Sequence, residues 1–159
     1  LGDATARLKI AGAATAGDRR LIGELKRRIA NAGLASRVEW FPNVTREQKI
    51  AFLRSLTLFS VPTLYPEAFG LYVLEAMACG IPVVQPASAA FPEIVGATGG
   101  GVCVPPRDAG ALARAWRQLL GNAVQRASLG RAGRLGVEKH FNARTMGERF
   151  CVAAGRVCK

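Results

Sequence analysis

The stretch PEAFGLYVLEAMACGIPVV, residues 66–84, decides how this sequence folds, because it predicts a loop, a helix and a strand in succession. We expect the helix to run from Phe69 to Cys79 and Gly80 to end it. A strand is then expected from Ile81 to Gln85. Nearly every side of the helix is apolar, so the pattern predicts that the helix is buried.

Outward from this stretch, short apolar runs alternate with helical patterns. Further strands are predicted at residues 7–11, 37–41, 56–61 and 101–104. Further helices are predicted at residues 18–32, after Thr45 with Gln48 as its capping-box partner, near Phe91, from Asp108 to Leu120, and from Asn122 onward. This regular alternation favours an α/β fold, a parallel sheet with helices on both faces. Ligands of such sheets bind beyond the carboxyl ends of the strands.

Two glutamates belong to the central stretch. Glu75 is the only charge within the predicted helix and sits on a mostly apolar face, where an ionised carboxylate needs a partner. Its two acceptor oxygens suit a vicinal diol such as that of a ribose, and a solvated place at the helix edge is the plainer alternative. Glu67 precedes the helix, where compensation of the helix N-terminus would by itself explain it.

The backbone amides of Phe69, Gly70 and Leu71 lie in the first turn of the predicted helix, where amides lack intrahelical partners. We expect them to point into the crevice and to favour anions and hydroxyl oxygens. Gly70 has no side chain to block the approach of a ligand to the backbone. The segment therefore predicts a site for an anionic or hydroxyl-rich ligand.

Seven residues separate Glu67 from Glu75, with Phe-Gly-Leu among them and Ala-Met-Ala after Glu75. This pattern resembles the E-x7-E signature of a large retaining family of glycosyltransferases, group 1 or family 4, which have the two-domain GT-B architecture. An E-x7-E alone would be weak evidence. Flanking blocks match in the same order, so the resemblance covers nearly the whole chain: residues 7–12, 37–44, 91–95 and 100–108.

The resemblance implies a Rossmann-like domain, the C-terminal half of a GT-B glycosyltransferase, that binds a nucleotide-diphospho-sugar. It assigns the transferred sugar to Glu67, the candidate catalytic residue, and the ribose hydroxyls to Glu75. The amides of residues 69–71 would hold sugar hydroxyls and the diphosphate. The loop after the second strand would contact the base through Val44, Arg46 and Lys49, although Lys49 fits a solvated helix position equally well.

The resemblance further implies transfer with retention and without a metal or other cofactor. The sequence agrees with the second point, because its aspartates stand too far apart for a D-x-D metal motif, at Asp3, Asp18 and Asp108. The acceptor would be a polysaccharide or a lipid-linked glycan, bound mainly by an N-terminal domain.

Residues 1–159 are predicted to form a single domain of a longer parent. The family's donor half normally begins with a strand and a loop whose Arg and Lys neutralise the diphosphate, and we expect that segment and the acceptor domain to precede Leu1. On that expectation the fragment alone is inactive.

The net charge of +11 leaves a second function class open. A basic Rossmann-like module could bind nucleotide, nucleic acid or an anionic membrane without catalysis. No aromatic residues interleave with the basic clusters, so nucleic acid is not expected. Four cysteines without a C-x-x-C pair indicate a reduced, cytoplasmic protein, and the basic tail is compatible with a peripheral place on the inner face of the membrane. An epimerase on the same scaffold and a nicotinamide-dependent domain fit less well, because the glycine fingerprint of the latter is absent.

Overall fold

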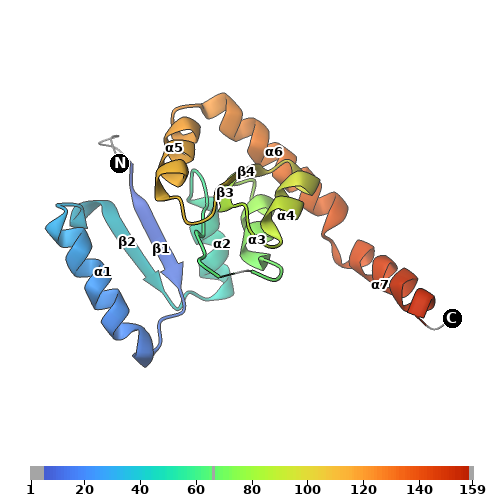
Figure 1. The fold of residues 1–159 in the computed structure, drawn as a ribbon, viewed down its shortest axis with the longest axis horizontal. Coiled ribbons are helices and arrows are strands. Elements are labelled where there is room, and N and C mark those ends of the chain that lie inside the picture. Colours follow the sequence, from blue (N-terminus) through green and yellow to red (C-terminus); the bar gives the residue numbers. More distant parts are fainter. Residues whose placement is uncertain (1–5, 66, 158–159) are drawn as a thin grey trace. The chain divides into compact units, whose positions relative to one another are not determined.

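The computed structural model of the chain describes residues 6–65 and 67–157. Its contacts divide the chain into two compact units, Leu1–Phe52 and Leu53–Lys159, and each is described by itself (Figure 1).

The first unit is a strand–helix–strand arrangement. Strand β1 (Leu8–Gly12) pairs in parallel with β2 (Val38–Pro42), in a register that places Leu8 opposite Val38. The connection consists of η1 (Ala16–Asp18), α1 (Arg19–Asn31) and η2 (Ala35–Arg37). Helix α1 ends where Gly33 takes a φ of 68°, a left-handed conformation that glycine adopts without strain.

Helix α2 (Arg46–Arg54) begins as its capping box predicts. The amide of Gln48 donates to the Thr45 hydroxyl at 3.3 Å, and the amide of Thr45 donates to Oε1 of Gln48 at 2.9 Å.

The second unit packs helices around a short parallel pair, β3 (Val83–Pro86) and β4 (Gly101–Val104). Its helices are α3 (Leu71–Ala78), α4 (Phe91–Thr98), α5 (Ala109–Leu120), α6 (Ala123–His140) and α7 (Ala143–Val157). Val84 and Val104 pack against Ala111 and Leu119 of α5. As predicted, the Asp108 side chain caps α5, accepting from the amide of Ala111 at 2.8 Å.

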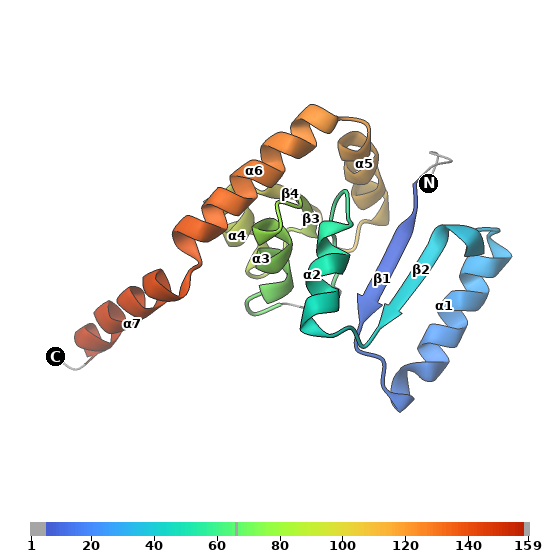
Figure 2. The same cartoon turned by 180° about the vertical axis from the view of Figure 1, so that it is seen from behind.

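Helix α6 lies against α3 and α4, an arrangement that Figure 2 shows from behind. Three glycines at intervals of three residues make this close packing feasible: a methyl group at Gly130 would overlap the carbonyl oxygen of Gly80, and Gly133 and Gly136 closely approach Gly100 and Thr98. Because these positions carry no side chains, α6 can pack closely against α3, α4 and the loops that follow them.

The α/β fold with parallel strands and interleaved helices is confirmed, but the strand predicted at residues 56–61 is wrong. Only Phe59 pairs there, through a single parallel bridge to Val83. Beyond Phe59 side chains replace the backbone ladder: the amide of Val61 donates to Oε1 of Gln85 at 3.1 Å, and the hydroxyl of Ser60 donates to the carbonyl of Val84 at 2.6 Å. The described strands accordingly form one parallel pair in each unit.

Candidate functional site

The candidate site is built around the first residues of α3, which begins two residues later than the pattern predicts. Gly70 is the N-cap and has a φ of 71° and a ψ of 48°, so the chain turns left-handed there and the helix starts at Leu71. A β-carbon at Gly70 would lie 2.9 Å from Cε1 of Phe91, a fully buried ring. Both the conformation and the contact favour glycine at this position.

The Glu67 carboxylate folds back onto this turn. Its Oε1 accepts from the amides of Phe69 and Gly70, each at 3.4 Å, and its Oε2 accepts from the hydroxyl of Tyr72 at 3.1 Å. The amide of Phe69 first, and then the Tyr72 hydroxyl, lower the pKa of Glu67 below its ordinary value. The carboxylate is therefore held in its charged form at the start of α3.

This arrangement changes one expectation about the amides. The amides of Phe69 and Gly70 were expected to face an open crevice, and in the structure they face Glu67. The reason is the left-handed turn at Gly70, which brings the Glu67 side chain within reach of both. Distances of 3.4 Å are long for a hydrogen bond between an amide and a carboxylate, so these two contacts are weak.

Glu75 lies near the middle of α3, and its side chain is half-buried. The predicted burial of this helix holds for Val73, Leu74, Ala76 and Met77. Leu71, by contrast, is 62% exposed, and Ala78 is exposed as well. Val73 and Met77 are fully buried on the side that packs into the unit. Because Leu71 and Ala78 stand four residues before and three residues after Glu75, the three share the accessible side of the helix.

The residues predicted to contact a base lie in the first unit. Val44 is half-buried in the loop after β2, Arg46 is the exposed first residue of α2, and Lys49 is half-buried on the next turn. The structure thus brings Glu67, Phe69 and Gly70 into contact within the second unit, whereas Val44, Arg46 and Lys49 belong to the first.

Two residues that the sequence did not single out support these groups. Tyr72 donates to Glu67, and its position five residues on from Glu67 is the signal that could have found it. Asn43 bonds through its side chain to both backbone groups of Ala14, so it joins the loops that follow β1 and β2. An Asn between Pro42 and Val44 is typical of a left-handed turn, which its φ of 53° confirms.

Within residues 6–65 and 67–157, no group of three or more His, Cys, Asp and Glu side chains could hold a metal ion. No helix in that part of the chain is long and apolar enough to cross a bilayer.

Comparisons with known proteins agree with this architecture. The D-inositol 3-phosphate glycosyltransferase of Salinispora tropica is 39% identical over 111 residues, which cover 70% of this chain and 22% of that protein. The structure of sucrose-phosphate synthase from Thermosynechococcus elongatus matches with a TM-score of 0.82 and 29% identity, over 95% of this chain and 38% of that one. Anabaena HepE in complex with UDP-glucose matches in fold, with a TM-score of 0.86 at 21% identity over 97% of this chain and 42% of HepE.

This chain thus spans less than half the length of each of these proteins. The model of one protein family, described as glycosyl transferases group 1, matches residues 3–136. That range covers most of the chain and contains both glutamates, the left-handed turn at Gly70 and the four strands that the structure describes, so the chain belongs to the group 1 glycosyl transferases.

Proposed function

We propose that this chain is the donor-binding half of a glycosyltransferase and holds a nucleotide-diphospho-sugar at the start of α3. The observation that carries the proposal is the Glu67 carboxylate, held charged against the amides of Phe69 and Gly70, with Glu75 on the accessible side of the same helix. Membership in the family favours this function over a basic module without catalysis.

Glu67 acts on the transferred sugar in this proposal. Its Oε1 accepts from the amides of Phe69 and Gly70 over long distances, so the hydroxyl of a sugar can donate to that oxygen in their place. The amide of Leu71 stabilises the oxygens of the sugar and of the departing diphosphate, because the N-terminal end of a helix attracts negative charge. The amides of Phe69 and Gly70 join it when the sugar draws Oε1 of Glu67 away from them. The glycosyl group then passes to the acceptor on the face from which the diphosphate leaves, which gives retention.

Glu75 binds the ribose. It stands on the accessible side of α3 with Leu71, one helical turn further from the helix start than the amides that take the diphosphate. A carboxylate accepts from both hydroxyls of a vicinal diol, so this placement follows the order sugar, diphosphate, ribose along a donor. The base is contacted by Val44, in the loop that Asn43 fixes, and by Arg46 and Lys49 in the first turns of α2.

The proposal also covers the donor, the acceptor, the metal requirement and the cellular location of the parent protein. The UDP-glucose bound to HepE supports a nucleotide sugar as donor, and the name of the Salinispora tropica relative supports glycosyl transfer. The acceptor is a glycan or a lipid-linked glycan, bound mainly by another domain of the parent. The reaction needs no metal, and the protein works in the cytoplasm, in peripheral contact with the membrane.

Calorimetric titration of the chain with UDP, GDP and ADP tests the proposal. We expect one of the three to bind and Glu75→Ala to weaken it at least tenfold, whereas Glu138→Ala keeps full affinity. Glu138 is a suitable control because it removes the same charge from an exposed position of α6 in the same unit. Equal affinity in the wild type and Glu75→Ala would contradict the assignment of the ribose site. Absence of binding for all three nucleotides, by the chain and by its longer parent, would contradict the donor function.

A further inference from the structure

The ring of Tyr72 is fixed between two aromatic neighbours. Its centroid lies 6.2 Å from that of Phe59 and 6.3 Å from that of Phe91, both in tilted arrangements. Phe91 is fully buried, and the backbone of Phe59 is tied to β3 by hydrogen bonds to Pro82 and from Val84 at 3.0 and 2.9 Å. Because neither neighbour can move away easily, the Tyr72 hydroxyl has a defined position at the edge of this cluster.

That hydroxyl makes the shortest contact of the Glu67 carboxylate. Tyr72 donates to Oε2 at 3.1 Å, while the amides of Phe69 and Gly70 reach Oε1 only at 3.4 Å. Two long contacts to one oxygen allow a carboxylate to rotate about its terminal bond. A donor on the second oxygen prevents that rotation, because it fixes the carboxylate plane.

We propose that Tyr72 is a positioning residue, which orients the Glu67 carboxylate so that Oε1 faces the transferred sugar. This inference rests on the proposed role of Glu67 toward the donor sugar. Tyr72 itself need not touch the donor, since its half-buried ring packs beside Phe59 and Phe91 and its hydroxyl is directed at Glu67.

The hydrogen bond between Tyr72 and Glu67 shifts the pKa values of both side chains in the directions that preserve it. The Tyr72 hydroxyl lowers the pKa of Glu67, second to the amide of Phe69. Burial first, and then Glu67, raise the pKa of Tyr72 to about 12. Each group therefore stabilises the protonation state that the hydrogen bond needs, a phenol and a carboxylate.

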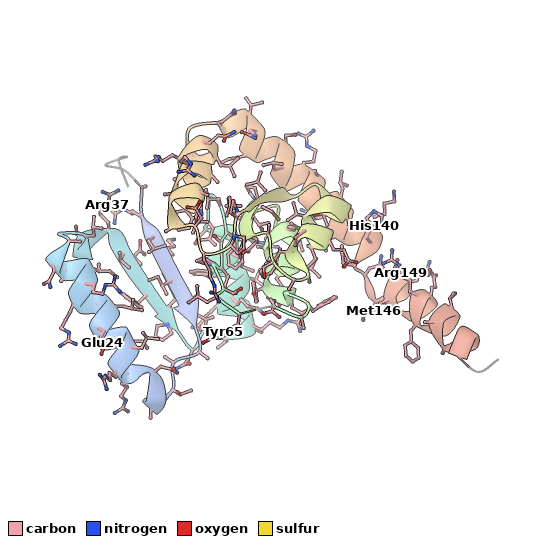
Figure 3. All side chains as sticks on the ribbon, viewed as in Figure 1. Glu24, Arg37, Tyr65, His140, Met146 and Arg149 are labelled. Atoms are coloured by element: carbon pink, nitrogen blue, oxygen red, sulfur yellow. The ribbon has the colours of Figure 1, made fainter. Side chains whose placement is uncertain are left out.

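The variant Tyr72→Phe tests the inference, because it keeps the ring packing and removes only the hydroxyl. The control is Tyr65→Phe, which removes a hydroxyl from a residue that is 81% exposed in the preceding loop (Figure 3). The amide signals of Phe69 and Gly70 in nuclear magnetic resonance spectra report the protonation of Glu67. We expect their titration midpoint to rise in Tyr72→Phe and to stay unchanged in Tyr65→Phe.

A binding measurement then shows whether the contact serves the sugar. The dissociation constants of UDP and UDP-glucose, and of GDP and GDP-mannose, are compared within each pair. Loss of one hydrogen bond should weaken the sugar nucleotide about three- to tenfold in Tyr72→Phe and leave the bare nucleotide unchanged. Tyr65→Phe should resemble the wild type in both.

The outcomes separate the two proposals. An unchanged titration midpoint, or an unchanged ratio of the two dissociation constants in Tyr72→Phe, would overturn the positioning role and leave donor binding intact. Equal weakening of the sugar nucleotide and the bare nucleotide would overturn it too, because it would indicate a general structural defect. Failure of the wild-type chain and of its longer parent to bind any of the four compounds would overturn the proposed function.

Discussion

The side chain of Asn43 pairs with the backbone of Ala14 in both directions: Oδ1 accepts from the Ala14 amide at 2.8 Å and Nδ2 donates to the Ala14 carbonyl at 3.2 Å. The backbone amide of Asn43 also donates to the carbonyl of Gly12 at 3.0 Å. One residue thus extends the pairing of β1 and β2 past the carboxyl ends of both strands, where the loop to Val44 begins.

Asn43→Ala and Asn43→Gly should destabilise the chain to different extents. Both lose the two side-chain hydrogen bonds, but alanine also has to adopt the φ of 53°, which costs roughly 1 to 2 kcal/mol for a residue with a β-carbon. We expect urea unfolding to give a lower free energy of unfolding for Asn43→Ala than for Asn43→Gly, with the wild type highest. Equal values for the two variants would indicate that the conformation at this position carries no strain.

Gly130→Ala should destabilise the second unit, because the new methyl group would overlap the carbonyl oxygen of Gly80. Forcing extra volume into a packed contact typically costs about 1 to 3 kcal/mol, more than alanine gains over glycine in a helix. Gly96→Ala in α4 is the matched control, since nothing lies within 4 Å of its added carbon. Thermal unfolding should show a lower Tm for Gly130→Ala and an unchanged or higher Tm for Gly96→Ala, and the same shift in both would argue against close packing of α6.

Acid should remove a part of the stability that Asp18 provides. Its carboxylate accepts from the hydroxyl and the amide of Thr15 at 2.7 and 2.8 Å, and these bonds, the hydroxyl first, lower its pKa below the ordinary 3.8. A lowered pKa in the folded state means that the unfolded chain takes up the proton first. The contribution is therefore complete above the ordinary value and is lost as the pH falls through the lower one.

The variant Asp18→Asn isolates this contribution from those of Glu47 and Glu67, whose pKa values are lowered as well. The difference in free energy of unfolding between the wild type and Asp18→Asn should be constant from about pH 6 to pH 5 and shrink toward about pH 2. A difference that does not change with pH would show that the bonds to Thr15 do not depend on the charge.

Features that depend on near neighbours in the chain could be predicted from the sequence. The caps at Thr45 and Asp108 each involve an amide three residues on, and both form as expected. The positions of α1, α5 and the strand pairs follow the same local patterns. Among the site residues, the position of Glu67 beside the start of α3 followed from its place in the loop.

Features that depend on distant partners could not be predicted. Residues 56–61 have the composition of a strand, but Val61 bonds to the side chain of Gln85, 24 positions away, in place of a neighbouring strand. The contact of Tyr72 with Glu67 depends on the left-handed turn at Gly70, which no periodic pattern contains. The spacing of Gly130 and Gly133 in α6 does not reveal that they face Gly80 and Gly100 either, because these pairs meet only when α6 packs against the rest of the unit.

Gly70→Ala should impair both stability and the site, and Gly80→Ala is its matched control. The two glycines have similar conformations, with φ values of 71° and 76°, so alanine incurs the same backbone strain at both. At Gly80 nothing lies within 4 Å of the added carbon, whereas at Gly70 it would lie 2.9 Å from Cε1 of Phe91 and 3.6 Å from Cγ of Glu67.

The buried ring of Phe91 cannot swing into solvent, so Gly70→Ala should be less stable than Gly80→Ala by about 1 to 3 kcal/mol in urea unfolding. Displacement of Glu67 should also raise the midpoint at which the Phe69 amide titrates, because the carboxylate then loses the donors that lower its pKa. Gly80→Ala should keep the midpoint of the wild type. If both variants lose the same stability and keep that midpoint, then contact with Phe91 and Glu67 is not the reason why residue 70 is a glycine, and backbone conformation alone accounts for it.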